Sequence, residues 1–223
     1  MELCSKCGKP PAAGDKLRLC GRCHSVKYCT AICQGDHWSH VCEVAGCARD
    51  VATIELLVAA GTGRVAALKS LLKYGANVNS RIQGRSPITP AESDFAKRFT
   101  ALYMAALKGH AAAVVVLLRA GAKVNKAGTD DGETALMVAA LVGEEIVVAM
   151  LLRAGAALNK TCNAGHTALS RAAREGHMAV LKLLIEAGAK VDKADEHCIT
   201  PLMSAAEMGH DAAVSVLLAA GVE

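Results

Sequence analysis

The chain has 223 residues, of which 52% are hydrophobic and only 3% are aromatic. Its formal net charge at pH 7 is +4, shared evenly as +2 in residues 1–50 and +2 in residues 51–223. Neither part carries the concentrated positive charge typical of nucleic-acid-binding proteins. The longest apolar runs, such as 111–118, are far too short to cross a bilayer. Composition therefore gives no case for a nucleic-acid partner or a membrane.

Eight of the ten cysteines lie within the first 47 residues. They follow the spacing of zinc ligands, with a histidine near the end of the series: Cys4-x2-Cys7, Cys20-x2-Cys23, Cys29-x3-Cys33 and His40-x-Cys42. Secreted disulfide frameworks also have clustered cysteines, but Cys4 follows Met1 too closely to leave room for a signal peptide. We therefore expect an intracellular protein, cytoplasmic or nuclear, whose reduced thiols can bind metal.

The seven paired cysteines and His40 are eight candidate ligands, enough for two tetrahedral zinc ions. Such a short segment has little core of its own, so metal binding would supply its folding free energy. If protein ligands fill every coordination position, both sites are structural and not catalytic. We therefore expect two structural Zn²⁺ ions as the cofactors of a small N-terminal domain, residues 1–47.

From about residue 51 onward the chain repeats itself. A glycine recurs once in each unit, at Gly75, Gly121, Gly155, Gly188 and Gly221. The last three intervals between these glycines are 34, 33 and 33 residues. A Thr-x-Leu motif begins 21 residues before each of the last four glycines, at Thr100, Thr134, Thr167 and Thr200. A second glycine recurs in the middle of each unit, at Gly63, Gly109, Gly143, Gly176 and Gly209. This periodicity predicts five copies of one structural unit.

Each unit reads as a pair of helices. The threonine can cap a helix N-terminus through its hydroxyl, and Pro201 stands at the first helical position, where a missing N–H costs nothing. In the fourth unit, a short helix over 169–175 ends at Gly176, which suits a left-handed cap. A second helix with an apolar face follows over 178–187. Paired alanines in the first helices permit neighbouring units to approach closely.

These motifs resemble the ankyrin repeat, whose period is about 33 residues with a Thr-Pro-Leu-His signature. The resemblance covers residues 51–223 and implies a mainly α-helical solenoid of about five repeats. The usual histidine after Thr-x-Leu is replaced by Tyr103, Met137, Ser170 or Met203. One interval is longer than the rest because of an insertion at about 80–99, which we interpret as a tolerated surface insertion or a partner-binding loop. The last repeat lacks a polar outer face.

The residues between the N-terminal cysteines include Tyr28-Cys29, Cys33-Gln34 and Asp36-His37-Trp38. With the cysteines, they resemble the MYND zinc finger over residues 4–42. The resemblance implies interleaved ligands, with one zinc on Cys4, Cys7, Cys29 and Cys33, and the other on Cys20, Cys23, His40 and Cys42. The spacing by itself equally allows sequential pairing. The segment after Trp38 is shorter than the family pattern, so His37 or Cys47 are alternatives for the last two ligands.

Both resemblances imply a protein-interaction adaptor. The MYND finger would bind short, proline-containing peptides, and Gln34 and Trp38 occupy positions of its peptide-binding groove, although Trp38 equally suits packing of the finger. The array would bind a partner protein through helix ends and loop tips. The helix-end candidates are Leu107, Lys108, Leu141, Val142, Arg174, Glu175, Glu207 and Met208. The tip candidates are Asp130, Asp131, Glu133, Asn163, His166, Glu196 and His197.

We find no phosphate-binding glycine loop and no convincing pairing of nucleophile and base, so we expect no enzyme and no small-molecule substrate. Two other interpretations remain. The finger could act as a RING-like ubiquitin ligase, because RING fingers share the interleaved two-zinc arrangement. It could also belong to a nucleic-acid-binding regulator, although its basic residues are scattered among acidic ones.

Overall fold

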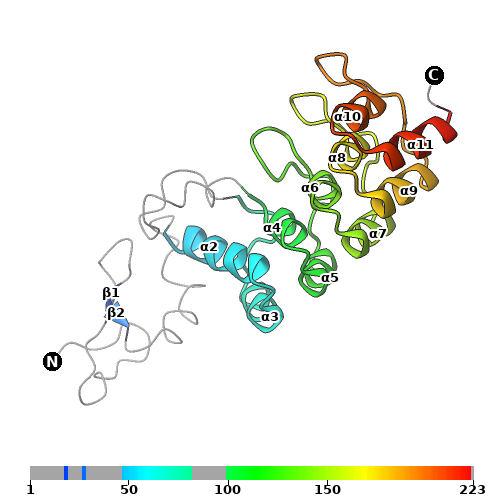
Figure 1. The fold of residues 1–223 in the computed structure, drawn as a ribbon. Helices are drawn as coiled ribbons and strands as arrows, with labels where there is room; N and C mark the ends of the chain where they lie inside the picture. The colour runs from blue at the N-terminus through cyan, green and yellow to red at the C-terminus, as the bar shows by residue number, and fades with distance from the viewer. Residues whose placement is uncertain (1–17, 20–26, 29–46, 82–98, 222–223) are drawn as a thin grey trace.

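In the computed structural model, residues 18–19, 27–28, 47–81 and 99–221 are described, and within these ranges ten α-helices form five consecutive pairs (Figure 1). The pairs are α2 (Cys47–Gly61) with α3 (Val65–Lys73), α4 (Ala101–Leu107) with α5 (Ala111–Arg119), α6 (Ala135–Val142) with α7 (Glu145–Arg153), α8 (Ala168–Arg174) with α9 (Met178–Glu186), and α10 (Pro201–Glu207) with α11 (Asp211–Ala219). The predicted five-repeat helical solenoid is confirmed.

The helices stack in two rows, the first helix of every pair in one row and the second in the other (Figure 1). The loops that precede α6, α8 and α10 project from the side of the first-helix row. Helix α2 begins at Cys47, where we expected the finger to end, and is longer than the first helices of the other repeats. The part of the insertion over 82–98 lies outside the described residues.

Threonine caps start four of the first helices, as predicted. The side chain of each accepts a hydrogen bond from the backbone N–H three residues later, which satisfies one of the free donors at a helix N-terminus. The four caps are Thr100 to Tyr103 (3.2 Å), Thr134 to Met137 (3.4 Å), Thr167 to Ser170 (3.1 Å) and Thr200 to Met203 (3.3 Å). Ser170 also returns a bond to the backbone of Thr167, which completes a capping box.

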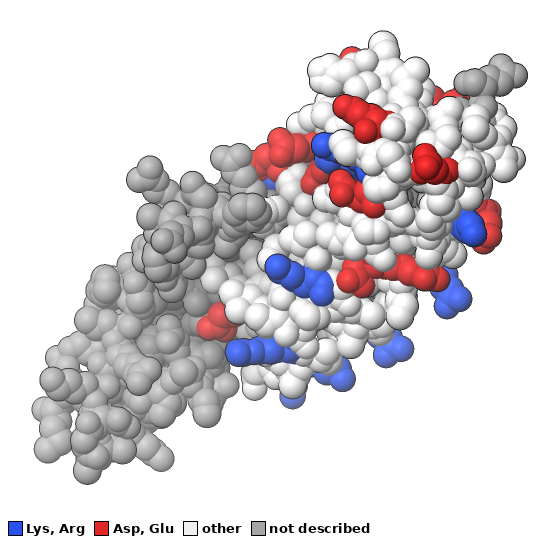
Figure 2. Space-filling model, viewed as in Figure 1, with Lys and Arg blue, Asp and Glu red and all other residues white. Residues whose placement is uncertain are grey.

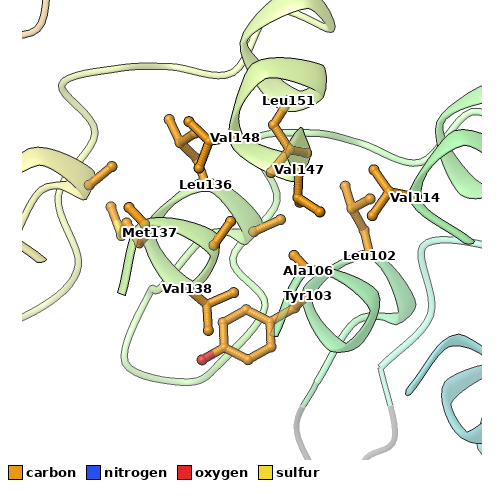
Figure 3. Packing of buried hydrophobic residues seen from close by; sticks show 14 of the residues in the cluster. Leu102, Tyr103, Ala106, Val114, Leu136, Met137, Val138, Val147, Val148 and Leu151 are labelled. Atoms are coloured by element: carbon orange, nitrogen blue, oxygen red, sulfur yellow. The ribbon is translucent and has the colours of Figure 1, made fainter. Parts of the chain in front are cut away.

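Small side chains lie where neighbouring first helices touch. The alanine pairs of α4, α6 and α8 are fully buried, at 0% exposure: Ala105 and Ala106, Ala139 and Ala140, Ala172 and Ala173. Leucines and valines of both rows fill the space around them, and Figure 3 shows Leu102, Leu136, Val147 and Val148 converging there. In the last repeat the equivalent alanine, Ala206, is exposed, and so are Met203 and Leu218.

Some second helices are preceded by a histidine, and this histidine contacts the repeat before its own. Nε2 of His110 lies 3.1 Å from the carbonyl oxygen of Gly61, and Nε2 of His177 lies 2.9 Å from that of Leu141. These carbonyls end the preceding first helix and have no partner within it. The histidines therefore brace loops, and Gly176 has the positive φ (70°) of the expected left-handed turn.

The loop that follows the second helix of a repeat, which we call the outer loop, carries an asparagine. This asparagine makes a second link between neighbouring repeats, which the sequence pattern did not lead us to expect. The Oδ1 atom of Asn125 accepts from the backbone N–H of Ala157 (2.7 Å), and its Nδ2 donates to the carbonyl of Gly155 (3.1 Å). Asn79 binds the next repeat in the same way, and Oδ1 of Asn159 accepts from the backbone N–H of Lys190 (2.8 Å). Because each side chain replaces water at backbone groups of the following loop, it holds the two loops in register.

A lysine returns a bond in the opposite direction. Nζ of Lys160 donates to the backbone carbonyl of Asn125 (2.6 Å), and Nζ of Lys193 donates to that of Asn159 (3.0 Å). Lys126 makes the same bond to Asn79. Together the asparagines and lysines form a ladder that runs along the outer loops and connects only consecutive repeats.

We predict that Glu144→His raises the free energy of unfolding by about 0.5–1 kcal/mol. Glu144 takes the place of the bracing histidine in the third repeat and lies against Gly109, at the C-terminal end of α4. A carboxylate there faces the negative end of a helix and cannot donate to a carbonyl, whereas an imidazole can. Chemical denaturation followed by far-UV circular dichroism measures the change. Glu145→His, one residue later at an exposed helix start, should bring no gain.

We also predict that Cys198→Gly stabilises the protein. Cys198 has φ = 61° in a turn where the two preceding repeats have Gly132 (80°) and Gly165 (79°). Relief of the left-handed strain, about 1–2 kcal/mol, exceeds the unfolded-state entropy that glycine adds, about 0.4–1 kcal/mol. The midpoint of denaturation should therefore rise. Gly165→Ala is the matched opposite: its Cβ would lie 2.7 Å from the backbone nitrogen of Glu196, and it should destabilise.

Candidate partner-binding surface

The eight predicted zinc ligands lie outside the described residues, as do Gln34, Trp38 and His37, and Cys47 is the first residue of α2. What is described of this region is a short antiparallel ladder between β1 (Arg18–Leu19) and β2 (Lys27–Tyr28). It brings together the segments that immediately precede Cys20 and Cys29 in the sequence. Seven thiols and one imidazole are the donor set that Zn²⁺ prefers, so the residues present fit this metal.

The predicted contact residues at the helix ends occupy two equivalent positions in successive repeats. Among them, Leu107 and Leu141 are half-buried, and Leu107 packs against the core. The other six are exposed: Lys108, Val142, Arg174, Glu175, Glu207 and Met208. The exposed apolar side chains are thus Val142 and Met208, with Glu175 at the equivalent position between them. The helix ends therefore present a mixed polar and charged surface with two separate apolar points, not a continuous apolar stripe.

The loop tips contact one another. The backbone N–H of Asn163 donates to the carbonyl of Asp131 (2.7 Å), and its Nδ2 donates to the carbonyl of Asp130 (3.2 Å). The N–H of Glu196 donates to the carbonyl of Ala164 (3.4 Å). Their side chains still reach solvent, because Asp130, Asp131, Asn163 and Glu196 are all exposed, as is His197. The tips of the last three repeats therefore form one connected rim with exposed polar side chains.

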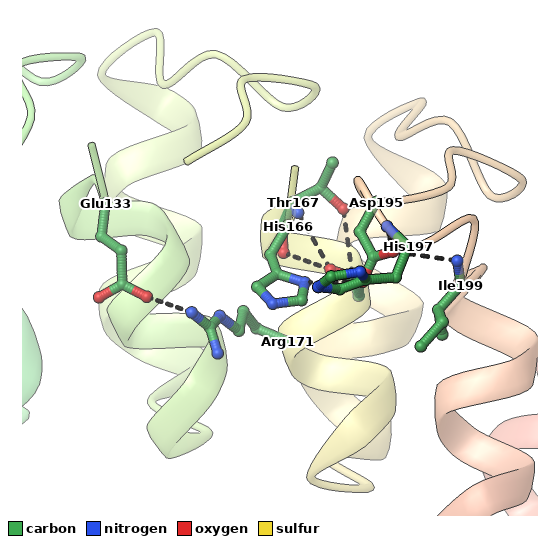
Figure 4. A network of polar contacts seen from close by, with 8 residues as sticks. Glu133, His166, Thr167, Arg171, Asp195, His197 and Ile199 are labelled. Carbon is green, nitrogen blue, oxygen red and sulfur yellow. Dashed lines mark hydrogen bonds and ion pairs between the residues drawn. The ribbon is translucent and has the colours of Figure 1, made fainter. Parts of the chain in front are cut away.

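Glu133, predicted as a tip contact, instead lies beneath the rim and bonds to residues of the neighbouring repeats. Its Oε2 accepts from the hydroxyl of Tyr103 (2.9 Å), and its Oε1 accepts from the guanidinium of Arg171 (Figure 4). The side chains of Glu133 and Arg171 are only 15% and 18% exposed. The sequence analysis did not predict this contact. A signal for it was present, because Arg171 is charged where the preceding repeats have the apolar Met104 and Val138.

The neighbouring His166 is half-buried and pairs with Asp195, Nδ1 to Oδ2 at 3.4 Å. Burial and the nearby Arg171 lower the pKa of His166, and Asp195 opposes them only in part. For Asp195, burial by itself would raise the pKa, but hydrogen bonds from the backbone N–H groups of Ile199 (3.0 Å) and His197 (2.8 Å) lower it overall. These bonds hold the last tip in its turn, which is a structural role.

Burial, and then the adjacent Glu133 carboxylate, raise the pKa of the Tyr103 phenol well above its usual value, so the hydroxyl remains a donor. The ring of Phe99 stacks on Tyr103 with centroids 5.2 Å apart. Over the residues that the structure describes, no three His, Cys, Asp or Glu side chains gather as a metal site, and no helix is long and apolar enough to cross a membrane. The polar groups beneath the rim thus connect repeats to each other.

Charge separates between the two sides of the array. The tips and first helices over 127–144, 161–177 and 194–210 carry eight acidic and two basic residues. The second helices and outer loops over 111–126, 145–160 and 178–193 carry eight basic and three acidic residues. In the view of Figure 2, acidic side chains gather over the upper part of the array and basic ones along its lower edge. The side that carries the candidate contacts is therefore the acidic one.

Comparison with known families agrees with this architecture. The family model for ankyrin repeats, in three copies, matches residues 56–162 and 147–223, and the model for the MYND finger matches residues 4–43. No curated protein matches the chain. MYND fingers bind zinc, and both modules typically mediate protein–protein interactions without catalysis. The chain belongs to the ankyrin-repeat family and has a MYND finger at its N-terminus.

Proposed function

We propose that the protein is an adaptor with two binding modules: a two-zinc finger over residues 1–47 that binds short peptides, and an ankyrin array over 51–223 that binds a partner protein. The observation that carries the proposal is the rigid five-repeat stack, which presents exposed helix ends and an exposed rim of tips on one acidic side. A rigid surface suits recognition because little conformational freedom is lost on binding.

In this proposal, one zinc is held by Cys4, Cys7, Cys29 and Cys33, and the other by Cys20, Cys23, His40 and Cys42. The β1–β2 ladder joins the segments next to Cys20 and Cys29, which belong to different ions in either pairing, so the interleaved arrangement rests on the resemblance to the MYND finger. Each ion then ties together distant parts of a segment that has little core of its own. Bound zinc would supply structure only, while Gln34 and Trp38 would contact the peptide.

We predict two zinc ions per chain by native mass spectrometry of the full-length protein. His40→Ala should lower the count, because a tetrahedral site loses one of its four ligands. His37→Ala is the matched control, three residues away, and should leave two ions bound. Loss of zinc in His37→Ala with retention in His40→Ala would assign the ligand to His37 instead. A protein that binds no zinc would contradict the finger proposal.

The acidic side of the array indicates what kind of partner it fits. Asp131, Glu175, Glu196 and Glu207 are exposed there, whereas Arg174 is the exposed cation on the same segments. Opposite charges favour encounter and suppress wrong partners, so a segment with spaced Lys or Arg residues is the complementary ligand. Val142 and Met208 add two apolar contact points for aliphatic side chains of that segment.

A matched pair of charge variants tests this. Partners captured by the zinc-loaded wild-type protein should bind Glu175→Lys/Glu207→Lys about tenfold or more weakly, because two attractive charges become repulsive. Glu186→Lys/Asp192→Lys makes the same change in net charge at exposed outer positions and should bind within about twofold of wild type. Titration by fluorescence anisotropy at two salt concentrations measures both. Equal losses would contradict an acidic binding side, and a wild-type protein without partners would contradict the adaptor itself.

A further inference from the structure

One side chain of the third repeat bonds to both neighbouring repeats at once. Glu133 lies at the base of the third tip, directly before the cap of α6, and its two carboxylate oxygens point in opposite directions along the array (Figure 4). One accepts from Tyr103 in α4 of the second repeat, and the other accepts from Arg171 in α8 of the fourth. The three residues, which we call the Glu133 clamp, therefore span three repeats.

The asparagine and histidine side chains described above each contact a single neighbouring repeat. Asn125 binds only the loop that follows α7, and His177 binds only the end of α6, so each joins a repeat to its immediate neighbour. When every contact is of this kind, the stability of a repeat array is a sum of single-repeat and nearest-neighbour terms. Both bonds of the Glu133 clamp also join neighbours, but they share one carboxylate, so the strength of one bond depends on the other. This dependence of the fourth repeat on the second is what such a sum does not contain.

The clamp is sensitive to the loss of any member. Tyr103 is 5% exposed, and the side chains of Glu133 and Arg171 are less than one-fifth exposed, so water can replace a missing partner only poorly. The Nε atom of Arg171 is buried without a hydrogen bond, which leaves its ion pair with Glu133 as the main compensation for the buried charge. Loss of the Tyr103 hydroxyl therefore changes how firmly Glu133 holds Arg171.

We propose that the Glu133 clamp couples the second, third and fourth repeats into one cooperative unit, so that loosening the second repeat is felt in the fourth. The coupling runs from Phe99, which stacks on Tyr103, to α8. It makes the middle of the array a single rigid body under the acidic rim. This coupling does not depend on the presence of a binding partner.

Hydrogen exchange of the zinc-loaded full chain tests the proposal. Tyr103→Phe removes one hydroxyl and keeps the stacked ring. It should speed exchange of the α8 amides at least about threefold, as expected for residues that share one hydrogen-bond network. Arg171→Met should speed exchange in α4 to a similar degree. Asn125→Ala, which removes a link between the second and third repeats without touching Glu133, should leave α8 exchange within about 1.5-fold of wild type.

A second comparison adds Tyr103→Phe to a protein that already carries Glu133→Gln. There the clamp is already broken, so Tyr103→Phe should have no further effect on α8. The coupling proposal is wrong if the effects of Tyr103→Phe and Arg171→Met on exchange rates simply multiply in the double variant. It is also wrong if Tyr103→Phe alters exchange only in α4 to α6. Equal effects of Asn125→Ala and Tyr103→Phe on α8 would also overturn it. If Glu133→Gln fails to fold, the single variants and Asn125→Ala still decide the outcome.

Discussion

The close approach of neighbouring first helices is the constraint on which the rest of the structure depends. Over the part of the chain that the structure describes, a helix pair does not bury its apolar side alone, because its first helix packs apolar side chains against the adjacent repeats. The fully buried alanine pairs set the distance between repeats, since a larger side chain there would push the helices apart. The spacing then decides which loops, tips and turns can reach each other.

Polar contacts between repeats are consequences of that spacing. Along the outer loops, asparagine and lysine side chains connect each repeat to the next through backbone groups. At the turns, histidines bind the last carbonyls of the preceding first helix. These bonds contribute modestly one by one, about 0.5–1.5 kcal/mol each, but they recur in register, so they fix the relative rotation of successive repeats. The result is a stiff surface on which exposed side chains keep defined positions.

The two sides of this stack differ in what they offer to other molecules. Among the described residues of the array, the second helices and outer loops carry most of the lysines, and three of these are already bound to asparagine carbonyls. Among the described residues of the array, the rim and helix ends carry most of the acids, of which Asp130, Glu133 and Asp195 make contacts within the array. The number of charged side chains available to a partner is therefore smaller than the composition suggests. The surface that remains consists mainly of exposed carboxylates and two separate apolar side chains at helix ends.

Local sequence signals determined the repeat number, the helix pairs and the threonine caps, because each depends on residues within one unit of about 33. Only the tertiary structure showed that Glu133 meets Tyr103 and Arg171, since these residues lie 30 and 38 positions away and do not recur in the repeat. The half-burial of Leu107 and Leu141 was likewise decided by packing between repeats. Periodicity specifies which positions face a neighbour, but the contact of two particular side chains depends on the stacked geometry.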